Sequence, residues 1–156
     1  MIWEGLTEDL IFLGLDVEHH DDVFRTMGSN LVKLGYCKES YVDALISREK
    51  DFPTGINMGE IGIAMPHTDR EHVNKEAVSI GVIKKSASFL QMGTTDVPVD
   101  AKIIFMLAVK DPEAHLVFLQ RIILMLQDQE VLKKILQAKN KTEIVEIIKE
   151  KEKEFE

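Results

Sequence analysis

Apolar residues repeat at helical spacing near the start of the chain. Those within residues 23–34 recur every three or four positions and are followed by Gly35, which predicts an amphipathic helix that ends at the glycine. A second pattern of this kind opens at Glu39 and ends before the turn-forming segment 52–55. Residues 10–15 are mostly apolar and predict a short strand ahead of the two helices.

The middle of the chain is patterned as strands. Apolar runs predict strands at 61–65, 78–83 and 102–109, and a weaker candidate lies at 87–92. No internal repeat and no linker rich in proline, glycine or serine interrupts these patterns, so residues 1–156 are expected to form a single domain.

The last third of the chain is patterned as helices. Asp111, followed by a proline, is typical of a helix N-cap, and the apolar segment 112–126 predicts a mostly buried helix. Two further helices are expected at 129–137 and 142–149, the second with Thr142 as its cap.

The order of helices, then strands, then helices is typical of a sheet covered on both faces, which is an α/β layered sandwich. The chain has 156 residues with 45% hydrophobic content, enough to bury a sizeable core. In such sheets, reactive groups gather where strands end and loops begin.

Charge and composition narrow the function. A formal charge of -8 opposes binding to nucleic acid and suits a basic protein partner. No apolar run is long enough to cross a membrane and no signal segment is present, so we expect a cytoplasmic protein without direct membrane insertion. Cys37 is the one cysteine, which fits a reduced compartment. The charged segment 149–156 is expected to be a frayed, solvated terminus.

His67 follows the apolar segment 61–65 through Pro66, which fixes the direction of the chain, so we expect its imidazole to be presented at a strand end. Such an imidazole can bind a metal, activate a nucleophile or be the nucleophile. Asp69 and His72 match no zinc spacing, and no Gly-x-Ser-x-Gly or glycine-rich nucleotide motif is present, so no metal and no cofactor are expected. The nucleophile is the remaining interpretation.

Three separated motifs carry a family resemblance. Gly62-Ile-Ala-Met-Pro-His67, preceded by Ser47-Arg-Glu-Lys-Asp-Phe-Pro-Thr-Gly55, resembles the phosphorylation-site region of enzyme IIA of the bacterial phosphoenolpyruvate-dependent sugar phosphotransferase system, fructose/mannitol type. Asp111-Pro-Glu-Ala-His115-Leu resembles the second histidine motif of that family. The motifs stand in the family's order across essentially the whole chain. Within the family, the first segment together with Asp96-Val97 is most similar to galactitol-specific members.

The resemblance implies a three-layer α/β/α sandwich with a mixed β-sheet, in the type-2 enzyme IIA domain. It implies that His67 accepts a phosphoryl group from phospho-HPr and passes it to a cysteine of a sugar-specific enzyme IIB, with the membrane enzyme IIC as an indirect partner. It also implies that Arg48 and His115 lie beside the acceptor and stabilise charge. Independently, His115 falls in the first turn of a helix, where free N–H groups and the helix dipole favour an anion.

The same resemblance leaves a second class of function open. Regulatory homologues of the nitrogen-related phosphotransferase branch keep the histidine but act by binding other proteins. His67 argues only against the related binding domains of anion transporters, which do not need it. No role is expected for His19 and His20, which are interpreted as solvated residues before a helix, and His72 is expected to face water.

Overall fold

A mixed five-stranded sheet forms the centre of the computed structural model, which describes residues 5–155 except for the side chains of 112–115, 118 and 119. The strand order is β1-β4-β5-β3-β2. The pairs β1–β4 and β3–β5 are parallel, whereas β4–β5 and β2–β3 are antiparallel. The strands are β1 (Ile11–Leu15), β2 (Gly55–Met58), β3 (Ile61–Ala64), β4 (Ala77–Leu90) and β5 (Pro98–Ala108).

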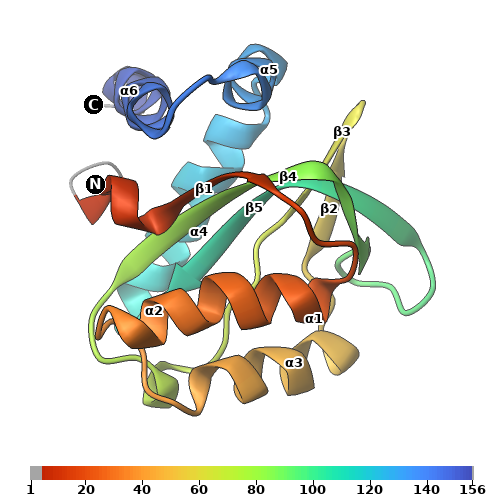
Figure 1. Cartoon of the computed structure of the whole chain (residues 1–156), viewed down its shortest axis with the longest axis vertical. Helices are drawn as coiled ribbons and strands as arrows, with labels where there is room; N and C mark the ends of the chain where they lie inside the picture. The colour runs from red at the N-terminus through yellow and green to blue at the C-terminus, as the bar shows by residue number, and fades with distance from the viewer. Residues whose placement is uncertain (1–4, 156) are drawn as a thin grey trace.

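Helices cover both faces of this sheet, as Figure 1 shows, with α1 to α3 on one side and α4 to α6 on the other. The expected three-layer α/β/α sandwich with a mixed sheet is therefore confirmed. The helices are α1 (His20–Val23), the π-helical η3 (Phe24–Gly28), α2 (Ser29–Lys33), α3 (Tyr41–Asp51), α4 (Pro112–Leu126), α5 (Gln129–Gln137) and α6 (Lys141–Glu152), with the 3-10 turns η2 (Glu8–Leu10), η4 (Arg70–His72) and η5 (Lys153–Phe155).

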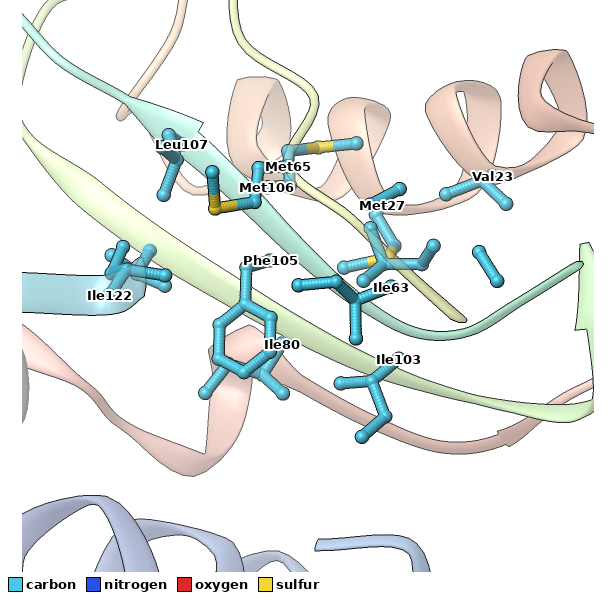
Figure 2. Packing of buried hydrophobic residues seen from close by; sticks show 14 of the residues in the cluster. Val23, Met27, Ile63, Met65, Ile80, Ile103, Phe105, Met106, Leu107 and Ile122 are labelled. Carbon is cyan, nitrogen blue, oxygen red and sulfur yellow. The ribbon is translucent and has the colours of Figure 1, made fainter. Parts of the chain in front are cut away.

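The hydrophobic core lies on both faces of the central strands. Ile63, Ile80, Ile103 and Phe105 are fully or almost fully buried, and Figure 2 shows them beside one another on the strands. Close packing between β3 and β5 depends on Gly62, because a Cβ atom at this position would overlap the backbone carbonyl of Asp100.

The parallel pairing of β3 with β5 positions the candidate chemistry. Both strands end at the same edge of the sheet, so the residues that follow Ala64 and Ala108 emerge side by side. The pairing continues past β3, because the backbone N–H of Leu107 donates to the carbonyl of Pro66 at 2.9 Å. This bond brings the start of α4 next to the segment that carries His67.

Two expectations about the strands need correction. The strands expected at 78–83 and 87–92 are not separate: residues 78–83 and 87–90 belong to the 14-residue β4, whose pairing with β5 is irregular between Val82 and Ala87. Residues 55–58 were expected to begin in a turn, yet they form β2. Gly55 is required there, because a Cβ atom would lie 2.6 Å from the carbonyl oxygen of Leu90.

The expected burial of α4 is wrong for the side chains that the structure describes. Ile122 and Met125 are fully buried, but Leu116, Val117 and Leu124 are 64%, 54% and 51% exposed. The helix is apolar on several sides, and only one of these sides faces the core.

The C-terminal expectations also need correction. The cap of α6 is Asn140, whose side chain accepts the N–H of Glu143 at 2.9 Å, and not Thr142. The charged terminus is not frayed in the part described, because α6 continues to Glu152, which is fully buried. Lys151 holds this end in place through ion pairs to Asp128 at 2.9 Å and to Glu154 at 2.6 Å.

Candidate functional site

His67 lies two residues beyond the buried strand β3, and its side chain is half-buried. Its Nδ1 atom is 2.8 Å from the carbonyl oxygen of Met65. A carbonyl can only accept a hydrogen bond, so this contact requires the proton on Nδ1. In the neutral imidazole the lone pair is then on Nε2, which is the nitrogen able to form a new bond to an electrophile.

Arg48 lies in the last turn of α3, and its guanidinium carbon is 5.1 Å from the centre of the Phe52 ring. The ring is 61% exposed and gives the guanidinium a flat surface to rest on. This contact places the guanidinium of Arg48 beside the residue that follows α3.

Arg48 and His67 line the same open hollow, which has a volume of about 720 Å³. We call it the His67 hollow. Both signs of charge occur around it, with cationic groups from α3, from η4 and from the segment that follows β5. Its lining residues are Arg48, His67, Thr68, Asp69, Arg70, Glu71, Val109, Lys110, Asp111 and Leu116.

The side chain of His115 lies outside the described residues. Its backbone belongs to the first turn of α4, and the hollow is lined by Asp111 before that turn and by Leu116 after it. The helix start therefore borders the same hollow as His67 and Arg48, where its N-terminal dipole favours an anion.

Glu49 is a site residue that the sequence analysis did not single out. The residue is 6% exposed, and Thr54 donates to its carboxylate from both the backbone N–H, at 2.9 Å, and the hydroxyl, at 3.0 and 2.9 Å. Burial raises the pKa of Glu49 to about 7, although the Thr54 donors and Arg48 oppose the shift. The available signal was its place between Arg48 and the Pro-Thr-Gly turn in the first motif.

His72 does not simply face water as expected. Its Nδ1 atom is 2.8 Å from the hydroxyl of Ser40, and its side chain is 22% exposed. This bond links η4 to the start of α3, so His72 joins two segments of the fold and does not line the His67 hollow.

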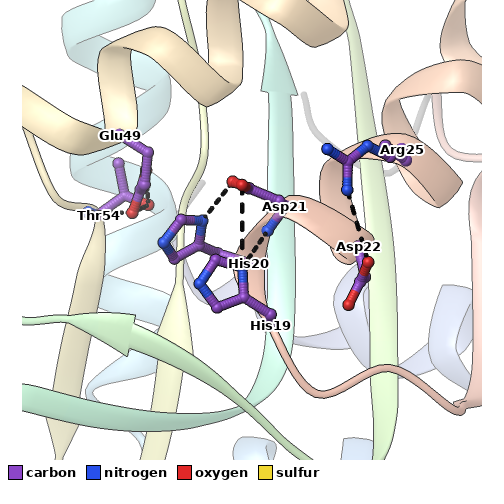
Figure 3. A network of polar contacts seen from close by, with 7 residues as sticks. All are labelled: His19, His20, Asp21, Asp22, Arg25, Glu49 and Thr54. Atoms are coloured by element: carbon purple, nitrogen blue, oxygen red, sulfur yellow. Dashed lines mark hydrogen bonds and ion pairs between the residues drawn. The ribbon is translucent and has the colours of Figure 1, made fainter.

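His19, His20 and Asp21 form the one grouping of potential metal ligands within the described part of the chain, with one ligand atom of each within 4.8 Å of the others (Figure 3). The Nδ1 atom of His19 accepts the N–H of Asp21 at 3.2 Å, which makes His19 the N-cap of α1. The Nδ1 atom of His20 is 2.7 Å from the Asp21 carboxylate. Burial, and then the neighbouring His19, lower the pKa of His20. The nitrogens that face Asp21 are thus already engaged in local hydrogen bonds.

Among the described residues, no helix is both long enough and apolar enough to cross a membrane.

The family described as "Phosphoenolpyruvate-dependent sugar phosphotransferase system, EIIA 2" matches residues 4–151 of the chain. The chain belongs to this family. EIIA proteins are phosphotransferase components, and the resemblance seen in the three motifs is therefore confirmed at the level of the family.

Named relatives include proteins specific for several sugars. The chain is 30% identical to the fructose-specific EIIABC component of Bacillus subtilis over 97% of its own length, which is 24% of that protein. It is 31% identical to the mannitol-specific enzyme IIA component of Staphylococcus aureus, covering 94% of this chain and 96% of that one. It is 24% identical to the galactitol-specific EIIA component of Escherichia coli K12, covering 84% and 87%. The chain thus spans about a quarter of the fructose relative and most of the other two.

Solved structures agree with the fold. The crystal structure of IIA mannitol from Escherichia coli superposes with a TM-score of 0.77 at 25% identity, covering 92% of this chain and 98% of that one. A complex of enzyme IIA mannitol with phosphorylated enzyme IIB mannitol from the same organism gives a TM-score of 0.76 at 26% identity, covering 92% and 96%. The nitrogen regulatory protein IIA-Ntr of Neisseria meningitidis, at 21% identity with a TM-score of 0.78 and coverage of 94% and 98%, shares the fold.

Proposed function

We propose that this EIIA protein accepts a phosphoryl group from phospho-HPr on Nε2 of His67 and passes it to a cysteine of a sugar-specific enzyme IIB. The observation that carries the proposal is the 2.8 Å contact between Nδ1 of His67 and the carbonyl of Met65. It keeps the proton on one nitrogen and the lone pair on the other, as nucleophilic attack on phosphorus requires.

The transfer needs no cofactor, because one bond replaces another. The Nε2 lone pair forms a bond to phosphorus while the bond from phosphorus to the HPr nitrogen breaks and leaves its electron pair on that nitrogen. In the second step the cysteine thiolate of enzyme IIB attacks phosphorus, and the electron pair of the broken bond returns to Nε2. The proton stays on Nδ1, which donates a hydrogen bond to the carbonyl of Met65 throughout.

Arg48 and His115 are proposed to stabilise the charge on the three equatorial phosphoryl oxygens. Phosphoryl transfer depends mainly on in-line positioning and charge neutralisation. Arg48 lines the same hollow as His67, and the first turn of α4, which carries His115, adjoins that hollow. A fixed guanidinium presents several N–H donors to such oxygens, which supports this role.

The proposed partners are HPr as donor and enzyme IIB as acceptor, with the membrane enzyme IIC receiving the group indirectly. The chain's formal charge of -8 favours a basic donor protein. The structural neighbour that contains phosphorylated enzyme IIB mannitol supports an acceptor of that class. A cytoplasmic location is proposed from these partners.

The finer proposal is that the acceptor is a galactitol-type enzyme IIB, supported by the motif from Arg48 to Gly55. Fructose-type and mannitol-type enzyme IIB proteins are the acceptors to compare, because fructose and mannitol relatives are 30% and 31% identical to this chain. Faster transfer to the galactitol-type enzyme IIB is expected, and equal or reversed rates would remove this subgroup assignment.

The second candidate function is regulation by protein binding. It is a candidate because the nitrogen regulatory protein IIA-Ntr has the same fold.

One assay distinguishes a phosphoryl carrier from a regulator. The purified chain is incubated with phosphoenolpyruvate, enzyme I and HPr, and then with an enzyme IIB. Labelling at one histidine followed by rapid transfer to the enzyme IIB cysteine supports a carrier, whereas labelling without onward transfer to any acceptor supports a regulator.

A further inference from the structure

Three hydrogen bonds, joined through the backbones of Thr54 and Met65, connect a buried carboxylate to the imidazole of His67. Glu49 accepts the N–H of Thr54 at 2.9 Å, and the carbonyl of Thr54 accepts the N–H of Met65 at 3.1 Å. The carbonyl of Met65 is in turn 2.8 Å from Nδ1 of His67. Each hydrogen bond holds a residue that makes the next one with its other backbone group, because the N–H and the carbonyl of Thr54, and then those of Met65, are joined through one Cα atom.

We propose that Glu49 is a positioning residue for His67, acting through Thr54 and Met65 to hold the imidazole in its nucleophilic orientation. This inference rests on the proposed function for its effect on transfer. The inference extends beyond the proposed function because it gives a role in transfer to Glu49, a buried residue that does not line the His67 hollow.

Thr54 depends on Glu49 because of its place in the chain. It precedes β2, whose first residue is Gly55, and it follows Pro53, which fixes only one backbone angle. Both of its donors are directed to the same carboxylate, as Figure 3 shows. Without Glu49, these two donors would be buried without a hydrogen-bond acceptor, and Thr54, whose carbonyl binds Met65, would lose its anchor.

The anchor works whether Glu49 is ionised or protonated. As a carboxylate it accepts two hydrogen bonds from Thr54. As a carboxylic acid it keeps a carbonyl oxygen for the Thr54 N–H, and its own O–H can donate to the Thr54 hydroxyl. A glutamine amide offers the same pair of groups, so Glu49→Gln is a conservative variant for this role, whereas Glu49→Ala removes the anchor.

The experiment compares the rate of phosphoryl acceptance from phospho-HPr with the tautomer of His67 in the unphosphorylated protein, read from its ring ¹⁵N chemical shifts. For Glu49→Ala we expect the rate at saturating donor to fall by about tenfold to a hundredfold, since small misplacements of reacting groups have effects of this size. The KM for phospho-HPr should stay within about twofold, because Glu49 is buried and is not available for direct contact with a protein donor. The Nδ1–H tautomer should lose its dominance.

Two further variants keep the test decisive if Glu49→Ala fails to fold. Thr54→Val removes the hydroxyl contact and Thr54→Ser keeps it, so the first should slow transfer and alter the His67 spectrum while the second should not. Glu49→Gln should restore most of the rate and the wild-type tautomer. Unchanged rate and spectrum in both Glu49→Ala and Thr54→Val would overturn the proposal, and so would a slower rate with an unchanged tautomer.

The outcome for wild type separates this inference from the proposed function. If the wild-type protein accepts no phosphoryl group, the carrier function fails, but the ¹⁵N comparison still decides whether Glu49 sets the His67 tautomer. If wild type is labelled and the tautomer of His67 is the same with and without Glu49, only the positioning role of Glu49 fails.

Discussion

The Nδ1 atom of His67 lies 2.8 Å from the carbonyl oxygen of Met65, two residues earlier in the chain. The bond therefore turns the ring back toward its own strand and leaves Nε2 on the opposite side of the imidazole. Met65 is itself held by Thr54 on the side of β2, and Pro66 is held by Leu107 on the side of β5. Two neighbouring segments thus hold the peptides on either side of the one whose carbonyl binds the ring.

The first prediction is that His67→Ala abolishes labelling by phosphoenolpyruvate, enzyme I and HPr, because it removes the only nitrogen proposed to bond to phosphorus. His72→Ala is the matched control, since His72 lies five residues further on but bonds to Ser40 outside the His67 hollow. That control should be labelled at the wild-type rate. Undiminished labelling of His67→Ala would refute the assignment of the acceptor.

The second prediction concerns Arg48. Arg48→Ala should slow acceptance by about one to two powers of ten, because hydrogen bonds to charged groups contribute roughly 1.5–3 kcal/mol. Arg48→Lys should recover only part of the rate, since an ammonium keeps the charge but not the planar group that rests on Phe52.

Arg25→Ala is the control for Arg48, because Arg25 is paired with Asp22 on a solvent-exposed helix surface. It should change the rate very little, as exposed ion pairs have small effects. The measurement is single-turnover labelling at saturating phospho-HPr. Equal rates for Arg48→Ala and Arg25→Ala would show that Arg48 does not stabilise the transferred group.

Much of the fold could be predicted because hydrophobic spacing reports burial directly. The amphipathic helix up to Gly35 and the strand before Pro66 both follow from local patterns. β2 could not be predicted, because its glycine and asparagine resemble a turn, and it pairs only when β3 lies beside it. The polar residues Lys84 and Lys85 interrupt β4 in sequence, but the strand continues through an irregularity in its pairing.

Some residues of the candidate site could also be predicted from the sequence, and others could not. His67 and Arg48 were predicted because each belongs to a contiguous motif, and the structure brings both to one hollow. Glu49 belongs to the same motif as Arg48, but its importance depends on burial and on a carbonyl–amide contact between Thr54 and Met65. Neither can be derived from local spacing, because both depend on which segments lie beside one another in the folded chain.

The third prediction is a pH-dependent stability difference between wild type and Glu49→Gln. Burial raises the pKa of Glu49 to about 7 from its ordinary value of 4.5, with the nearby Asp21 adding to the shift and the Thr54 donors and Arg48 opposing it. The folded protein therefore binds this proton more tightly than the unfolded chain. The contribution to stability is complete below pH 4.5 and is lost as the pH rises toward 7.

Chemical denaturation at pH 5 and pH 7.5 measures this difference. The free energy of unfolding of wild type, relative to Glu49→Gln, should fall by about 2 kcal/mol over this range, since one pKa unit corresponds to about 1.4 kcal/mol. A difference between wild type and Glu49→Gln that does not change with pH would mean that Glu49 titrates alike in the folded and unfolded chains.

The last prediction separates the two histidines of the proposed site. His115 is proposed to stabilise charge without bonding to phosphorus, so His115→Ala should still be labelled on His67. Loss of one donor to the phosphoryl oxygens costs about 1–3 kcal/mol, which slows transfer by about one to two powers of ten. The label should be stable to alkali and labile to acid in both proteins, because the P–N bond of a phosphohistidine breaks readily once the ring nitrogen is protonated. Mass spectrometry of the labelled peptide locates the group. A phosphoryl group on His115 of the wild-type protein would contradict the division of roles. Wild-type rates from HPr and to enzyme IIB in His115→Ala would also contradict it, because the helix N-terminus alone would then be sufficient to stabilise the charge.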